Sequence, residues 1–364
     1  MPIYMDVHIV PGVKARDVAE AHRKDILVQE EHACKCITYW IDEARENIFC
    51  LIEAPNKDAV NDMHGRAHGL IPNKIIEVSA DLVHSFLGRI YDPVNAEVTA
   101  DGLKVFKDPS FRCLLVTRIP DPVLLKFQFG DVRASELLES YAAIIRKNLS
   151  AHEGREVEDK GPGFTTSFFS AAQAVACALA IRKDLTETIP DFHSHRIAIN
   201  AGEPVSSRDE LFGDTLHLAE QMCRIEKKYP IIVSSGVEEL ISKDFLHHRN
   251  MILALTPQDE TLLRLLFEKL DENWQKSDFN VTDYCEVVGM SKSQLYRKSI
   301  ALCGISPILL LKNFRLEKAK QLMKKQRHSI SEITFSSGFT SPSYFTKCFK
   351  KRYGLLPVAY MDLL

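Results

Sequence analysis

The chain has 364 residues, of which 45% are hydrophobic and 26% are charged, so it is long enough for two or three globular domains. No apolar run approaches the ~20 residues of a membrane span, and the stretch MPIYMDVHIV lacks the segments of a signal peptide. Nine scattered cysteines without a C-x-x-C spacing fit a reduced, cytoplasmic protein better than a disulfide scaffold.

The net charge of −3 conceals an uneven distribution of charge along the chain. Residues 274–364 carry 15 Lys and Arg against 6 Asp and Glu, a balance of +9, whereas the preceding 273 residues carry 31 against 43, a balance of −12. An acidic body with a basic C-terminal block indicates nucleic-acid binding. Solvated helices are also often basic, so charge alone leaves both interpretations open.

The first 80 residues alternate strand and helix patterns. Runs with β-propensity predict strands, and apolar residues at helical spacing predict helices, the second of which opens with a capping Asn56. The order β-α-β-β-α-β is that of the ferredoxin-like fold, so we expect an α+β ferredoxin-like domain over residues 1–84. The strands are expected over residues 3–10, 34–42, 47–54 and 74–78, and the helices over residues 14–30 and 56–70.

This N-terminal region is rich in histidine, with 6 of the 13 histidines in the first 84 residues. Asp6 and His8 share a strand face. His64 and His68 are four residues apart on a helix, a spacing that suits two imidazoles on one metal ion. Imidazole-rich sets suit nickel, copper or zinc. Solvated or core histidines would give the same pattern, because no single spacing here is a specific metal motif.

The middle of the chain again mixes strands and helices, over residues 111–242. We expect linkers on either side of it, over residues 85–110 and 243–257, and a hairpin over residues 196–205. A Gly-Pro-Gly turn at residues 161–163 follows a short acidic run. Such a turn can hold a phosphate group, or it can be a tight turn without chemistry.

From residue 258 to the end only helices are indicated. Two similar helix pairs flank an amphipathic helix over residues 308–325, and a serine caps the second helix of each pair, Ser291 or Ser341. Such a helix can enter the major groove with the polar side chains of its first turn at the base edges. The helices are expected to break at Gly289, Gly304, Gly338 and Gly354.

The stretches GMSKSQLYRK, NFRLEKAKQLM and ISEITFSSGFTSPSYFTKCFKKRYGLLPVAY resemble the DNA-binding domain of AraC/XylS-type transcription regulators. The resemblance implies an all-α double helix-turn-helix domain over residues 258–364, with double-stranded DNA as its partner. Arg297 can bind guanine in a bidentate manner and lysines fit phosphates, whereas Pro342 stands where a longer polar side chain can occur in the family. The candidate DNA-binding residues are Ser293, Gln294, Tyr296, Arg297, Lys298, Ser343, Tyr344, Lys347 and Lys350.

The stretches HEGREVEDKGPGFTTSFF and RIAINAGEPVSSRDELFGDTLHLAEQMCRIEKK resemble class III adenylate/guanylate cyclase catalytic domains. The resemblance implies an α/β cyclase-like domain over residues 111–242. Cyclases need two aspartates to hold two metal ions, but Arg118 and Pro162 stand at those positions. His217 and Gln221 stand where the family has its transition-state Asn and Arg. We therefore expect no catalytic residues, in a domain that pairs subunits or senses a ligand.

The stretches MDVH, AHRKD, NIFCLIEAP and MHGRAHGL look like a small family of nickel-binding ferredoxin-like proteins. The resemblance implies a dimeric α+β domain in which histidines hold nickel. The candidate metal ligands are His8, His22, His64 and His68, with Asp6 as a further possibility. Dimerisation alone is the competing role for this domain.

These observations predict a multidomain, homodimeric, cytoplasmic transcription regulator of the AraC type that binds specific DNA sequences and is not an enzyme. A metal such as nickel is the candidate effector, through the N-terminal domain. Two alternatives stay open: a residual nucleotidyl cyclase or nucleotide-sensing protein, and a metal-buffering protein.

Overall fold

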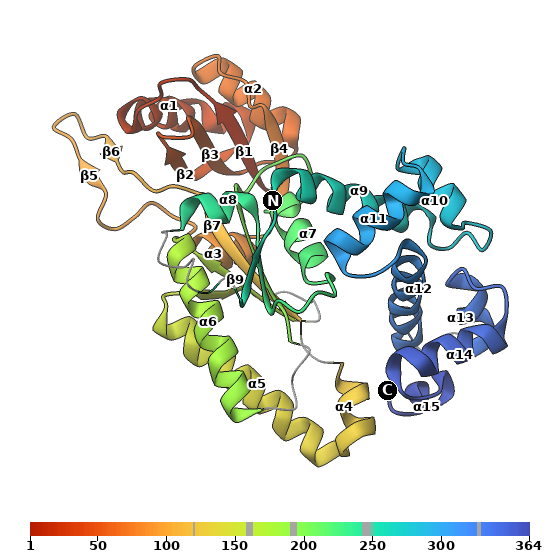
Figure 1. Ribbon diagram of the computed structural model, residues 1–364. Helices are drawn as coiled ribbons and strands as arrows, with labels where there is room; N and C mark the ends of the chain where they lie inside the picture. The colour runs from red at the N-terminus through yellow and green to blue at the C-terminus, as the bar shows by residue number, and fades with distance from the viewer. Residues whose placement is uncertain (119–120, 158–162, 190–194, 242–247, 249, 326–328) are drawn as a thin grey trace.

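The computed structural model describes residues 1–364 except 119–120, 158–162, 190–194, 242–247, 249 and 326–328. The chain is a multidomain protein, with two mixed α/β parts followed by a helical C-terminal part (Figure 1). We call the part around the four-stranded sheet the N-terminal body, the part around the six-stranded sheet the middle body, and the helices from residue 257 onward the C-terminal helices.

The N-terminal body has its strands in the order β2-β3-β1-β4, with β1 antiparallel to both β3 and β4. Helices α1 and α2 cover one face, because Val18 and Val60 pack against alternate residues of the strands such as Ile48 and Ile52. The expected strands and helices are confirmed. They are β1 Ile3–Ile9, α1 Ala15–Val28, the short 3₁₀ helix η1 Gln29–His32, β2 Lys35–Asp42, β3 Asn47–Glu53, α2 Lys57–Ala67 and β4 Lys74–Val78.

The segment expected as the first linker, residues 85–110, is packed against both neighbouring bodies. It contains the end of α3 (Ala80–Leu87) and a small hairpin of β5 (Glu97–Val98) and β6 (Lys104–Val105). The Phe106 side chain stacks on Tyr39 in the N-terminal body. Phe86 of α3 packs between the second face of the N-terminal sheet and the middle body, where it contacts the ring of Phe212.

The middle body has its strands in the order β12-β11-β10-β7-β9-β8. β10, β11 and β12 run parallel, whereas β7 is antiparallel to both of its neighbours. Helices α5 and α6 pack on one face of the sheet and α7 packs on the other. The elements are β7 Arg112–Arg118, α4 Pro122–Phe129, α5 Asp131–Ala151, β8 Arg155–Val157, β9 Gly163–Phe168, α6 Ala171–Thr188, β10 Ile197–Gly202, α7 Gly213–Met222, β11 Ile231–Val233, α8 Ser235–Leu240 and β12 Ile252–Ala254.

The prediction of a hairpin over residues 196–205 was wrong. β10 is a single strand that pairs with β7 and β11, and the chain leaves the sheet after Gly202. Pro204 cannot donate to a ladder, and its carbonyl instead accepts a hydrogen bond from the backbone of Phe212 at 2.8 Å. The segment expected as the second linker, residues 243–257, contains β12 in its described part.

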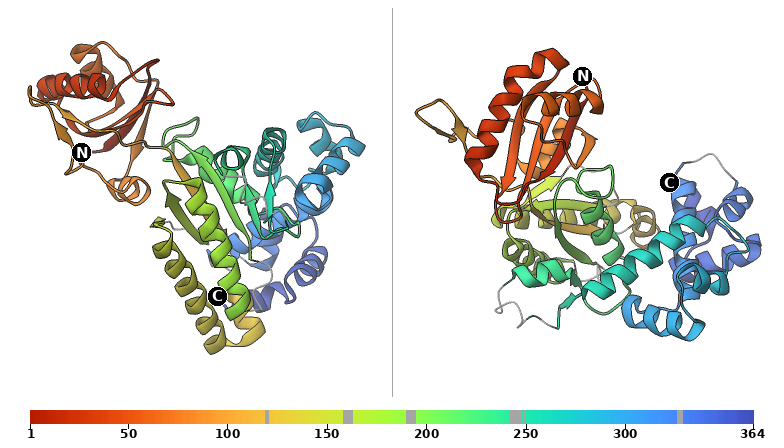
Figure 2. Two further views of the ribbon diagram at one scale, coloured as in Figure 1. Left: turned by 60° about the vertical axis from the view of Figure 1, so that its left-hand side comes forward. Right: turned by 90° about the horizontal axis from the view of Figure 1, so that it is seen from above.

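The C-terminal helices lie on a different side of the middle body from the N-terminal body (Figure 2). The expected breaks at four glycines are confirmed, because each has a positive φ that glycine adopts without strain. Within the described residues no single helix can span a membrane; α11 and α12 together meet that test by length and composition, but they are bent by 59°. The helices are α9 Pro257–Asn273, α10 Val281–Val287, α11 Lys292–Cys303, α12 Pro307–Lys324, α13 Ile330–Ser336, α14 Pro342–Tyr353 and α15 Pro357–Asp362.

Candidate functional site

Two helix pairs, α10 with α11 and α13 with α14, are joined by the long helix α12. The Ser291 hydroxyl accepts a hydrogen bond from the backbone N–H of Gln294 at 3.3 Å, and the Gln294 side chain accepts one from the backbone N–H of Ser291 at 3.0 Å. This capping box fixes the start of α11. The Ser341 hydroxyl accepts from the backbone of Tyr344 at 3.4 Å at the start of α14, where Pro342 is the first helical residue.

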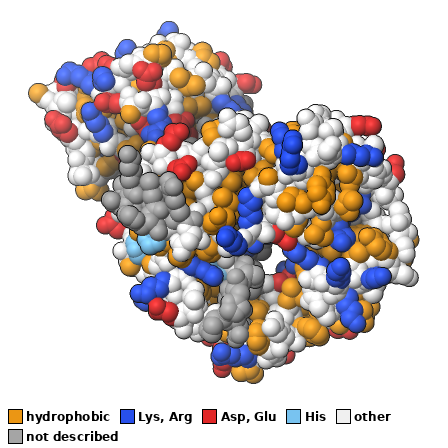
Figure 3. All heavy atoms as spheres, viewed as in Figure 1, with side chains coloured by type: hydrophobic (Ala, Val, Ile, Leu, Met, Phe, Trp, Pro, Cys, Tyr) orange, Lys and Arg blue, Asp and Glu red, His pale blue; other side chains and the backbone are white. Residues whose placement is uncertain are grey.

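The second helix of each pair presents its polar side to solvent. Leu295 and Phe345 are fully buried beneath α11 and α14, whereas Tyr296 and Tyr344 are 56% and 54% exposed. On the face drawn in Figure 3, Lys and Arg side chains are spread over the C-terminal helices, with hydrophobic side chains between them. All nine residues predicted to bind DNA are exposed: Ser293, Gln294, Tyr296, Arg297, Lys298, Ser343, Tyr344, Lys347 and Lys350.

A second cluster of functional groups lies inside the N-terminal body, between the sheet and its helices. Asp6, His8, Cys50 and His64 are all buried and bring potential ligand atoms within 4.8 Å of one another. A second set, which shares His64, consists of Asp25, His64 and His68.

His64 is the centre of this cluster. Its Nε2 donates a hydrogen bond to Asp6 Oδ2 at 2.9 Å and its Nδ1 donates one to Asp25 Oδ1 at 3.1 Å. Burial alone would lower the pKa of His64, but the two carboxylates raise it to about 10. His68 Nε2 also lies 3.1 Å from Asp25 Oδ1.

The carboxylates are held ionised by the same contacts. Burial opposes this, yet hydrogen bonds from His64 and His68 lower the pKa of Asp25 to about 2. The pKa of Asp6 is also lowered, because the attraction of His8 and His64 outweighs burial. Burial lowers the pKa of His8, which favours its neutral, metal-binding form. Imidazole, carboxylate and thiol groups in one enclosed space form a donor set that nickel or zinc can use.

The structure therefore brings together three of the four predicted metal ligands, His8, His64 and His68, with Asp6. The fourth, His22, is in neither set and lies against the ring of Tyr39, with 5.2 Å between the ring centroids. The sequence analysis did not predict Cys50 or Asp25 as metal ligands. Cys50 could have been found from strand register, because Cys50 lies opposite Asp6 in the β1–β3 ladder and so shares its face.

Three of the four positions that the cyclase resemblance singled out are described, on β7 and α7. Arg118 is the last residue of β7, opposite Gly163 in the ladder, and His217 and Gln221 lie on α7. Pro162 lies outside the described residues.

Comparisons with known proteins find family matches near both ends of the chain. Residues 284–362 match a family described as "Helix-turn-helix domain", and residues 4–78 match one described as "Nickel responsive protein SCO4226-like". The chain is 32% identical over 103 residues to the HTH-type transcriptional regulator MtrA of Neisseria gonorrhoeae, which covers 28% of this chain and 34% of that protein. The chain spans less than half the length of the first curated relatives that it matches.

Two solved structures are similar to parts of the chain. SCO4226 from Streptomyces coelicolor A3(2) is 34% identical, with 21% of this chain and 94% of that chain covered and a TM-score of 0.20. A bacterial light-regulated adenylyl cyclase is 12% identical, with 66% of this chain and 88% of that chain covered and a TM-score of 0.32. The chain thus carries an AraC-type helix-turn-helix domain at its C-terminal end and a domain of the SCO4226-like nickel-responsive family near its N-terminal end.

Proposed function

We propose that this protein is a transcription regulator of the AraC type that binds a specific DNA sequence through its C-terminal helices. The observation that carries the proposal is the pair of capped helices, α11 and α14, whose polar first turns face solvent. In helix-turn-helix proteins such first turns contact base edges in the major groove. The nine exposed residues of these helices are the proposed contacts.

Binding-site selection from random duplexes with the full chain tests this proposal. On the selected site we expect Arg297→Ala to cost about 1–3 kcal/mol and to relax preference at one base pair, since a bidentate arginine reads guanine. Lys350→Ala should weaken binding to all duplexes alike and reduce the salt dependence, because a lysine on a phosphate carries no sequence information. Lys24→Ala, an exposed lysine of α1, is the matched control. Equal affinity of the wild type for every duplex would refute the proposal.

We propose in addition that the N-terminal body, a ferredoxin-like domain, binds nickel and makes the regulator metal-responsive. The support is the buried set of imidazole, carboxylate and thiol groups around His64, together with the match to the SCO4226-like family. His8, His64 and His68 would hold the ion with Asp6, Asp25 or Cys50, and His22 would stay outside that shell.

Calorimetric titration of Ni²⁺ into the full chain tests the metal site. We expect saturable binding that His68→Ala weakens by about tenfold or more, as loss of one ligand or its close partner does. His84→Ala, which removes an exposed histidine of α3, should bind like the wild type. Binding that is equal in both variants would place the metal elsewhere. Nickel binding without any effect on DNA affinity would favour metal buffering over sensing.

The middle body is, in this proposal, a cyclase-like domain without catalytic activity. The support is the sequence resemblance to cyclases, which aligns Arg118, at the end of β7, and Pro162 with the two metal-binding aspartates of that family. Residual cyclase activity is the alternative. Cyclic nucleotide formed by the purified chain from ATP or GTP with Mn²⁺ would favour it.

We also propose that the protein is a cytoplasmic homodimer. The N-terminal body supports pairing, because it exposes Leu27 on α1 and Ile71 after α2, at 76% and 56%. Sedimentation equilibrium of the wild type and of a Leu27→Lys/Ile71→Lys variant tests this. A monomeric wild type would refute it.

A further inference from the structure

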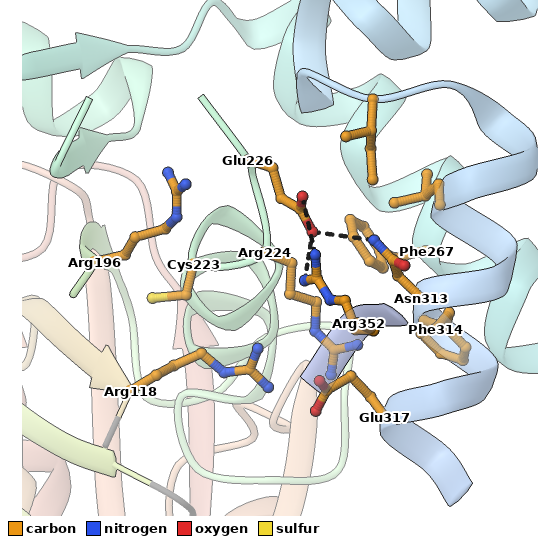
Figure 4. Close-up of a pocket in the computed structure, with 12 residues that line it drawn as sticks. Arg118, Arg196, Cys223, Arg224, Glu226, Phe267, Asn313, Phe314, Glu317 and Arg352 are labelled. Carbon is orange, nitrogen blue, oxygen red and sulfur yellow. Dashed lines mark hydrogen bonds and ion pairs between the residues drawn. The ribbon is translucent and has the colours of Figure 1, made fainter. Parts of the chain in front are cut away.

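A cavity of approximately 350 Å³ lies between the middle body and the C-terminal helices. Its walls come from both parts, with Arg118 from the end of β7 and Arg224 just after α7 on one side, and Asn313 of α12 and Arg352 of α14 on the other (Figure 4). A hollow is visible between these parts on the face drawn in Figure 3, with Lys and Arg side chains beside it. Any molecule bound in the cavity would therefore touch both parts at once.

The cavity is lined by four arginines and two glutamates, an excess of two positive charges. Glu226 is fully engaged by the C-terminal helices, because it accepts hydrogen bonds from Arg352 at 2.6 and 3.3 Å and from Asn313 Nδ2 at 3.1 Å. Arg196 is also engaged, because it donates a hydrogen bond to the backbone carbonyl of Lys227 at 2.6 Å.

The other two guanidinium groups have no such partner. Neither Arg118 nor Arg224 forms a side-chain hydrogen bond or ion pair with another described residue, and Figure 4 shows both pointing into the same space, toward Glu317. Arg224 lies about equally far from the rings of Phe267 and Phe314, at 5.5 and 5.3 Å. Burial, and the neighbouring Arg118, lower the pKa of Arg224. Glu317 supplies one negative charge beside these two cations, so the space between the guanidinium groups keeps a net positive charge that favours a further anion.

A third polar side chain in the cavity wall, Asn313, has one atom without a partner. Asn313 is only 7% exposed, and its Oδ1 atom has no hydrogen-bond partner among the described residues. A buried acceptor of this kind is costly unless a donor reaches it. The cavity therefore offers two anion-binding groups and one acceptor, beside an apolar wall that includes Leu310 and Phe314.

We propose that this cavity binds a small phosphorylated molecule, a phosphate monoester, with its phosphate between Arg118 and Arg224 and a hydroxyl or N–H group on Asn313. The excess of two positive charges matches a phosphate dianion, and planar guanidinium groups bind phosphate oxygens in pairs. Because its walls come from both parts, the bound molecule fixes the C-terminal helices on the middle body. An effect of the bound molecule on DNA recognition rests on the proposed function, whereas binding of the phosphate monoester to the cavity does not.

The test measures binding by the full chain without DNA, by thermal shift and calorimetry, with AMP, inorganic phosphate and succinate as probes. We expect AMP to raise the melting temperature most. Arg118→Gln and Arg224→Gln should each weaken AMP binding about tenfold or more, since each removes a charged hydrogen-bond donor. Arg133→Gln, a change of an exposed arginine of α5, is the matched control and should bind like the wild type.

A variant that is expected to bind AMP more tightly distinguishes the loss of a binding group from a failure to fold. Glu317→Gln removes a negative charge beside the arginines but keeps an oxygen for the Tyr353 hydroxyl, which donates to Glu317 at 2.7 Å. It should tighten AMP binding at least about threefold. No binding of AMP or phosphate by the wild type, equal binding by all variants, or a preference for succinate would overturn the proposal. Retained AMP binding in a chain that binds no DNA would refute the proposed function alone.

Discussion

Gly163 shows how closely the two central strands of the middle body approach each other. It lies opposite Arg118 in the β7–β9 ladder. A Cβ atom at this position would come within 1.8 Å of the carbonyl oxygen of Thr117, which is backbone and cannot move aside alone. The glycine at this position is therefore required by the lack of space for a side chain in the sheet.

Gly163→Ala should consequently destabilise the protein by about 2 kcal/mol or more, because the two strands must separate to admit the methyl group. Urea unfolding followed by circular dichroism measures the change. Gly236→Ala in α8 is the matched control. It meets no atom within 4 Å and should change stability by no more than about 1 kcal/mol, in the stabilising direction. Equal effects of the two substitutions would contradict this account of Gly163.

The candidate metal site was only partly predictable at the level of single residues. The spacing of His64 and His68 and the alternation of Asp6 and His8 are local patterns, and the structure brings both pairs into one cluster, with His68 directly after α2. Asp25 joins them from a different helix and Cys50 from a different strand, so their contribution depends on how elements pack. His22 failed to join because the helix turns its side chain toward Tyr39.

Among the elements, α11 owes its start to a capping box formed by Ser291 and Gln294. Ser291→Ala should cost about 1 kcal/mol of stability, since it leaves a helix-terminal N–H without its partner. Ser293→Ala, two residues on and fully outside this box, should leave the midpoint of urea unfolding nearly unchanged and alter only DNA affinity. A loss of stability in the second variant as large as in the first would show that the cap is not the cause.

Elements with a clear apolar pattern could be predicted from the sequence, whereas the two-residue strands β5 and β6 could not. The helices of the C-terminal part have apolar periodicity, capping serines and terminal glycines, three signals that agree. β5 and β6 have two residues each, too few for any alternation. They are held in place by Leu103 and Phe106, which pack in the N-terminal core, so tertiary contacts decide the structure of that segment.

At the scale of the whole molecule, Asp121 at the start of α4 attaches the middle body to the C-terminal helices. It accepts a hydrogen bond from Lys320 of α12 at 2.8 Å and from the hydroxyl of Tyr360 of α15 at 3.0 Å. Burial would raise the pKa of Asp121, but Lys320 outweighs burial and holds the pKa below 3.8. The contact is therefore linked to pH.

Because the folded-state pKa is depressed, this contact stabilises the protein fully above the ordinary pKa of 3.8 and is lost as pH falls through the lower folded value. Asp121→Asn keeps the helix cap but should cost about 1–3 kcal/mol at pH 7. The difference from the wild type should shrink below about pH 4. Urea midpoints from about pH 3 to 7 measure it, with the exposed Asp58→Asn as control. A difference that stays constant over that range would contradict the ionised contact.

The hydrophobic cores do not follow the boundaries of the matched families. The helix-turn-helix match begins at residue 284, inside α10, yet Leu310 and Phe314 of α12 share one core with Val116 and Ala198 of the middle sheet. A chimaera that replaced residues 284–362 with the same segment of another regulator would therefore leave part of that core without its counterpart. Substitutions in this shared core must fit both parts at once, so the helix-turn-helix segment of this chain is not an independently exchangeable module.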